Sequence, residues 1–265
     1  ETEPLCFENK GEEIIFSNRL EKRGSTVIFV YGDEREKSAE KTNNELKPLD
    51  LKGKWDILET DDNALTLDYC DLYIDGELKN KNLPVSDVQE IACAYEKKVK
   101  VDVVFNFDVR DDGFENCKLV VETPEIFDIT VNGAIIDKTD LGFYNDPAFR
   151  ILDIRKAVKS GNNEIKLSCD FLQSEDVYQN MKNSLIFESE KNKLTYDMEI
   201  EAVYIIGDFG VKTDKPFEKS ERRALITDGG FYITSAPKTV YDGNIAEQGY
   251  PFFAGSMTLE KEFDW

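Results

Sequence analysis

Residues 157–167 read AVKSGNNEIKL, and the spacing of the apolar residues changes at Gly161. Between 151 and 158, apolar residues recur at intervals of three and four, which is the pattern of one face of a short helix. After the glycine, Ile165 and Leu167 alternate with polar residues, as on a strand. We therefore predict a helical turn over 151–159 that ends at Gly161 in a left-handed conformation and leads at once into a strand.

The clearest strand signal lies at residues 99–109, VKVDVVFNFDV, where every odd position is apolar and every even position except Val104 is polar. This pattern predicts a strand with one buried face. A slip in alternation near Cys70 predicts a bulge or a corner, and Asn132-Gly133 suits a type I′ hairpin. The one clear helix signal follows Pro84. Many short strands with little helix predict a mainly β protein, an antiparallel jelly-roll-like β-sandwich with short helices.

Three regions differ in composition. Two apolar runs within residues 12–31 predict a hairpin, and residues 32–49 hold almost nothing apolar, which predicts an exposed connection. We expect residues 1–45 to be an N-terminal hairpin and connection that belong to a preceding domain, and residues 46–211 to form the sandwich. We expect residues 212–265 to be a linker and a C-terminal β segment. The chain begins without Met and ends within an alternating pattern, so we expect a piece of a longer polypeptide.

Charge and composition exclude several functions. The chain has 54 acidic and 33 basic residues and a net charge of −21, which disfavours nucleic acid and anionic membrane surfaces as partners. Five cysteines without a CxxC pair argue against disulfides and zinc, and we expect a cytoplasmic location. The absence of histidine excludes Ser-His-Asp, Cys-His and HExxH chemistry and leaves carboxylate, Tyr, Lys or Cys chemistry.

The segment 142–149, GFYNDPAF, is the candidate binding loop. Tyr144 could stack on a sugar ring while Asn145 and Asp146 bind its hydroxyls. The alternative is that the phenylalanines of this segment fill the core and Asp146-Pro147 forms a turn. We expect no cofactor, although a structural calcium could take oxygen ligands from Asp140, Asp146 and Asp153 without EF-hand spacing.

The triplet Asp208-Phe209-Gly210 matches one kinase motif, but the other kinase motifs are missing, and we predict a turn at a strand end.

A series of residues resembles the galactose-binding-like β-sandwich domains of glycoside hydrolases, especially family 2 and the α-L-rhamnosidase-like enzymes. The residues that carry the resemblance are Val131-Asn132-Gly133, Asp146, Phe149, Asp153-Ile154 and the G-x-N-x-I-x-L arrangement of Gly161, Asn163, Ile165 and Leu167. Residues 205–209 and 249–255 also look like junctions between rhamnosidase-like modules, which implies the start of a second sandwich near 225. The catalytic (β/α)8 barrel of that family has no counterpart here.

The resemblance implies a non-catalytic carbohydrate-binding or scaffolding piece of a larger glycoside hydrolase. Its partner would be a carbohydrate or the catalytic domain of the parent chain, and hydrolysis would belong to that parent. Two alternatives remain: a self-contained glycosidase that uses a pair of carboxylates, and an interaction or spacer module without a sugar ligand.

Overall fold

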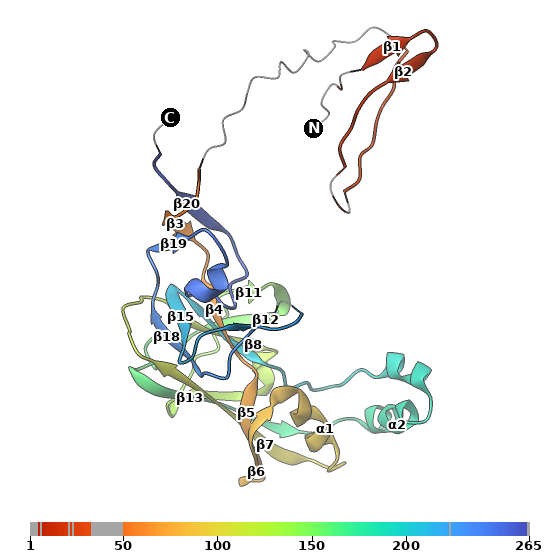
Figure 1. The fold of residues 1–265 in the computed structure, drawn as a ribbon. Coiled ribbons are helices and arrows are strands. Elements are labelled where there is room, and N and C mark those ends of the chain that lie inside the picture. The colour runs from red at the N-terminus through yellow and green to blue at the C-terminus, as the bar shows by residue number, and fades with distance from the viewer. Residues whose placement is uncertain are drawn as a thin grey trace. The chain divides into compact units, whose positions relative to one another are not determined.

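The computed structural model describes residues 5, 7–20, 22, 24–32, 50–222 and 224–263. The chain divides into two compact units, residues 1–50 and residues 51–265 (Figure 1). In the first unit, β1 (Glu8–Lys10) pairs antiparallel with β2 (Glu13–Ile15) around Gly11, whose φ is +68°. The predicted hairpin between the two apolar runs of 12–31 is not formed by strands: β2 pairs with the upstream β1, and residues 24–31 belong to no strand.

Every described residue from 7 to 32 is exposed, so this ribbon has no core of its own. The connection expected over 32–49 lies almost wholly outside the described residues.

The larger sheet of the second unit has eight strands. Its main path runs β10-β9-β13-β7-β18-β15, and β5 pairs with both β6 and β7. All of these pairings are antiparallel except the short parallel pairing of β18 with β7. The strands are β5 (Tyr69–Ile74), β6 (Glu77–Pro84), β7 (Val99–Val109), β9 (Asp128–Val131), β10 (Ala134–Ile135), β13 (Gly161–Phe171), β15 (Phe209–Thr213) and β18 (Phe231–Ser235).

The second sheet has five strands in the order β11-β12-β8-β14-β4, all antiparallel. One hydrophobic cluster joins it to the larger sheet, with Phe105 and Ile165 from one side and Leu119 and Ile205 from the other. This packing confirms the predicted mainly β sandwich. The strands are β4 (Asn63–Leu67), β8 (Cys117–Glu122), β11 (Phe143–Tyr144), β12 (Asp146–Asp153) and β14 (Val203–Gly207).

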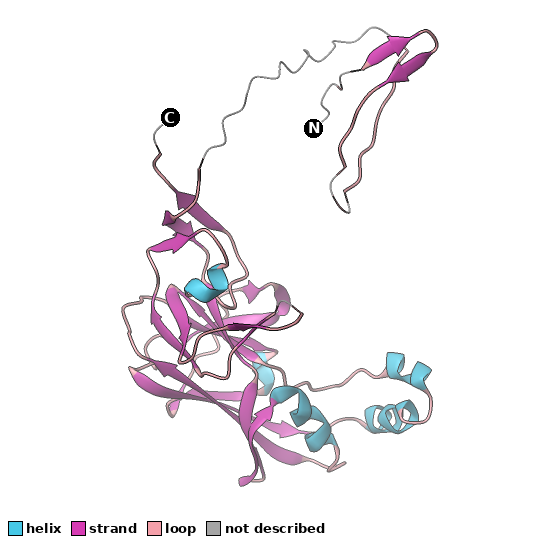
Figure 2. Ribbon diagram, in the orientation of Figure 1, coloured by secondary structure: helices cyan, strands magenta, loops and turns pink. Residues whose placement is uncertain are grey.

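The remaining elements are short (Figure 2). Residues 212–265 supply β18 to the large sheet, and two further strands from this region flank β3 in a three-stranded sheet of order β19-β3-β20. The helix predicted after Pro84 is confirmed as η1 and α1. The bounds are β3 (Lys54–Thr60), β16 (Glu218–Lys219), β17 (Leu225–Ile226), β19 (Thr239–Tyr241), β20 (Met257–Glu260), α1 (Val88–Cys93), α2 (Glu175–Ser184), η1 (Val85–Asp87), η2 (Pro124–Ile126), η3 (Glu188–Lys193) and η4 (Ile245–Gln248).

Several local predictions are confirmed. In β7 the odd positions are buried, while Lys100 and Asn106 are exposed and Asp102 is half-buried. The pairing of β5 with β6 shifts register after Cys70, and Asn132 and Gly133 have φ of 51° and 80° in the turn between β9 and β10.

The joint at Gly161 is only partly as predicted. Its φ is +83°, which confirms the left-handed conformation, and β13 begins at this residue. The helix predicted over 151–159 is wrong, because β12 continues to Asp153 and a single turn follows, in which the Val158 N–H donates to the Ile154 carbonyl at 3.2 Å. Ile151 lies on the strand opposite Val120, so the helical spacing combined a strand with the turn after it.

The amide of Asn163, which is fully buried, holds this joint together. Its Nδ2 donates to the carbonyls of Lys159 and Gly161, both at 2.8 Å. Its Oδ1 accepts from the Lys159 N–H at 2.9 Å and from Nδ2 of Asn132 at 2.8 Å. The amide therefore supplies the hydrogen bonds that a continuing helix would otherwise have made.

Candidate functional site

The outer face of the five-stranded sheet carries a group of aromatic residues. Side chains alternate between the two faces of a sheet, so Val120 and Ile206 point away from the core that lies between the sheets. Both are nevertheless buried, with 0% and 2% of their surface exposed. The half-buried residues packed over them are Tyr144, Phe149, Ile151, Tyr204 and Phe252. We call Tyr144, Phe149 and Tyr204 the aromatic face.

Tyr204 contacts both other rings of the aromatic face. Its centroid lies 6.0 Å from that of Tyr144 at an interplanar angle of 44°, and 5.8 Å from that of Phe149 at 66°. Burial raises the pKa of Tyr144, while a hydrogen bond with the Asn145 side chain acts in the opposite direction. Each of the three rings is partly exposed, so the aromatic face is an open apolar surface and not a closed pocket.

The predicted site residues lie at the edge of this face. The loop predicted over 142–149 is wrong: β11 and β12 form a tight hairpin there, with Asn145 at its turn and a φ of 60°. Asn145 and Asp146 are exposed, and Oδ1 of Asp146 accepts the Ala148 N–H at 2.8 Å. The structure thus brings Tyr144 into the aromatic face and places its two neighbours beside it.

Tyr204 is not among the residues predicted from the sequence, and Phe149 enters there only as a core residue in the alternative interpretation and as part of the resemblance. A signal was available for Tyr204: it stands between Val203 and Ile205, and alternation places it on the face opposite those two core residues. No comparable local signal links it to Tyr144, which lies on a different strand of the same sheet.

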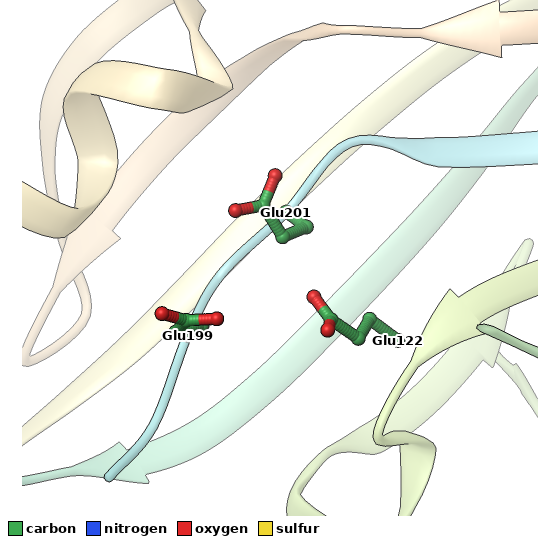
Figure 3. A group of neighbouring side chains, drawn as sticks. All are labelled: Glu122, Glu199 and Glu201. Carbon is green, nitrogen blue, oxygen red and sulfur yellow. The ribbon is translucent and has the colours of Figure 1, made fainter. Parts of the chain in front are cut away.

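Three carboxylates gather beside the five-stranded sheet. Glu122 lies at the end of β8, and Glu199 and Glu201 approach it from the irregular segment before β14 (Figure 3). One ligand oxygen of each lies within 4.8 Å of the others. Glu122 is also the ladder partner of Phe149, which places the carboxylates next to the aromatic face. We call these three residues the carboxylate cluster.

Two members of the carboxylate cluster, Glu122 and Glu201, have raised pKa values. Burial is the main cause that raises the pKa of Glu122, and the charges of Glu199, Glu201 and Asp146 raise it further. Burial, followed by the charge of Glu199, also raises the pKa of Glu201. Carboxylate oxygens are ligands that calcium accepts, so among the described residues this cluster is the group that could hold a divalent cation.

The aspartates considered for calcium already accept hydrogen bonds. Asp140, Asp146 and Asp153 each accept a backbone N–H from the residue two positions later, at 2.9, 2.8 and 2.9 Å. Asp140 also accepts from Arg150 at 3.2 Å. These bonds are typical of aspartates that stabilise turns.

The DFG triplet is structural, as predicted. Oδ1 of Asp208 accepts the N–H groups of Glu115 and Asn116 at 3.1 and 2.6 Å. A Cβ on Gly210 would lie 2.9 Å from the Ser235 carbonyl oxygen, so the glycine permits close strand packing.

The four described cysteines are free and buried, and Cys6 lies outside the described residues. Burial raises the pKa of Cys117 to about 12, with similar shifts for Cys70 and Cys169. These thiols are poor nucleophiles at neutral pH.

No family model and no curated protein matches the chain. Solved structures with some likeness are an α-L-rhamnosidase, a β-D-glucuronidase and a β-D-mannosidase, all from Dictyoglomus thermophilum. Their identities are 9%, 13% and 13%, their TM-scores 0.23, 0.32 and 0.29, and the matches cover 68%, 72% and 73% of this chain. The matched part spans 16%, 40% and 31% of those proteins. Since all TM-scores lie below 0.5, these likenesses establish neither a shared family nor a shared activity.

No helix in the described part of the chain has the length and apolar character needed to cross a membrane.

Proposed function

We propose that this chain is a non-catalytic carbohydrate-binding β-sandwich from a larger glycoside hydrolase. The observation that carries the proposal is the aromatic face with carboxylates beside it. The C–H face of a sugar ring packs well against partly exposed aromatic rings, and carboxylate and amide oxygens accept hydrogen bonds from its hydroxyls. Asn145, Asp146 and Glu122 lie around the aromatic face in positions suited to that role.

The link to a glycoside hydrolase rests on the sequence resemblance, chiefly the arrangement from Gly161 to Leu167. The proposed absence of catalysis rests on the sequence, because the resemblance covers an accessory sandwich and the chain has no histidine. Two of the three residues of the carboxylate cluster are exposed to solvent.

The experiment is a glycan array followed by calorimetric titration of the oligosaccharides that bind. We expect micromolar affinity at best, since an open face excludes little water. Tyr144→Ala and Tyr204→Ala should each weaken binding about tenfold or more, equivalent to about 1.4 kcal/mol of lost stacking. Tyr241→Ala is the matched control, because Tyr241 is 58% exposed on the separate three-stranded sheet. Unchanged affinity in both test variants would contradict the proposal.

A second candidate is a scaffolding module that docks the catalytic domain of the parent chain. It is favoured by three consecutive apolar residues after α2: Leu185, Ile186 and Phe187, which are 89%, 69% and 64% exposed. Apolar groups gathered at the surface often mark interaction sites. Replacing all three by Ser in the parent polypeptide should then accelerate proteolysis between the sandwich and the catalytic domain. A cleavage rate equal to that of the wild type would exclude this docking role.

A further inference from the structure

The larger sheet contains a gap at one edge of β7. Along its other edge β7 pairs with β13 over its full length, from Val99 to Val109. On the gap side it pairs with β5 only at residues 101–104 and with β18 only at Asp108 and Val109. Residues 105–107 therefore have no strand partner on that side among the described elements.

The backbone groups of Asn106 point into this gap. The Lys100 carbonyl accepts the Asp75 N–H at 2.8 Å, and the Arg110 N–H donates to the Ile233 carbonyl at 2.9 Å, both on the gap side of β7. Alternation along a strand then directs the N–H and C=O of the even residues toward this side. Asn106 thus presents a donor and an acceptor without a ladder partner.

A cavity of about 250 Å³ opens at this position. Leu67 and Phe231 supply apolar walls, while Asp68, Asp71 and Asn82 supply polar groups beside Asn106. Asp71 already accepts the Asn82 N–H at 2.9 Å, and Asp68, Asn82 and Asn106 are exposed. The cavity is smaller than the roughly 300 to 1,000 Å³ of pockets for drug-sized ligands, so it suits a small molecule.

We propose that this gap binds a neutral polyhydroxylated molecule of monosaccharide size. A hydroxyl group both donates and accepts, so it can satisfy the N–H and the C=O of Asn106 together. An ammonium ion cannot accept from that N–H. An anion would face Asp68, Asp71 and a net charge of −21, and an apolar ligand would leave these polar groups without partners. The C–H face of a sugar ring would contact Leu67 and Phe231.

This site lies at the gap in the eight-stranded sheet, where Leu67 of β4 contributes from the other sheet, and it involves no residue of the aromatic face. It is therefore independent of the function proposed above, and either site can fail without the other.

The test is NMR titration of the ¹⁵N-labelled chain with methyl β-D-glucopyranoside and with methyl β-D-galactopyranoside. At least one glycoside should shift the amide signals of Asn106, Asp68 and Asn82 with millimolar affinity. Asp68→Leu, which removes an acceptor and fills the opening, should weaken binding about tenfold. Asp128→Leu is the matched control, because Asp128 is an exposed aspartate on β9 of the same sheet.

Tyr204→Ala should leave these shifts unchanged, which separates this site from the aromatic face. The proposal is overturned if neither glycoside shifts the Asn106 amide, or if Asp68→Leu binds as tightly as Asp128→Leu. Shifts produced by glucosamine alone, without the neutral glycosides, would also overturn it, since they would indicate a cation site.

Discussion

Replacement of Asn163 by Ala should remove the largest set of side-chain hydrogen bonds at the joint between β12 and β13. The buried amide makes four hydrogen bonds, three of them to the backbone of Lys159 and Gly161. Each such bond contributes about 0.5 to 1.5 kcal/mol net, and some partners would remain buried without a substitute. We therefore expect the free energy of unfolding to fall by about 3 kcal/mol, a large part of the roughly 5 to 15 kcal/mol typical of a domain.

The assay is equilibrium urea denaturation followed by tryptophan fluorescence. Asn162→Ala is the matched control, because Asn162 is the exposed neighbour on the same strand. This substitution should lower the free energy of unfolding by less than about 0.5 kcal/mol. Asn163→Asp keeps the acceptor but turns a negative charge toward two carbonyls, so it should be at least as harmful as Asn163→Ala at neutral pH. A loss below about 1 kcal/mol for Asn163→Ala, equal to that of the control, would refute the account of this joint.

Three further predictions concern strain, pH and metal. Gly161→Val should cost about 1 to 2 kcal/mol in urea denaturation through backbone strain alone, since a Cβ would meet no atom within 4 Å, and a neutral effect would contradict the φ of +83°. The raised pKa of Glu122 favours its protonated form in the fold, and this stabilisation is lost as pH rises through that pKa. Glu122→Gln should therefore raise the melting temperature by about 1 °C near pH 7 and by less near pH 4, with the exposed Glu59→Gln as control. Dialysis against EDTA should leave the melting temperature unchanged, because Asp140, Asp146 and Asp153 already accept internal hydrogen bonds; a decrease that calcium reverses would show a structural metal at these aspartates or at the carboxylate cluster.

The strand alternation of β7 and the hairpin at Asn132-Gly133 were predictable because both depend on neighbouring residues. The helix over 151–159 was wrongly predicted for a physical reason. A short strand followed by one turn can place apolar residues at intervals of three and four, and only the pairing of Ile151 with Val120 distinguishes the two cases.

The candidate site was predictable only in part. Tyr144 could be proposed from its local segment, but the aromatic face needs Tyr204 from β14, and the carboxylate cluster needs Glu122 beside Glu199. These contacts follow from the strand order of the sheet, in which residues distant in sequence become neighbours. The gap beside Asn106 likewise arises where β7 changes partner from β5 to β18, and no short-range pattern encodes it.

The most direct test of the proposed function is to map a bound oligosaccharide onto the sandwich by NMR. An oligosaccharide selected on the glycan array should shift the amide signals of Tyr144, Asn145 and Tyr204, and the Tyr144→Ala/Tyr204→Ala double variant should lose these shifts while keeping the rest of its spectrum. Failure of every glycan on the array to bind, or binding that leaves the signals of the aromatic face unmoved, would contradict the account.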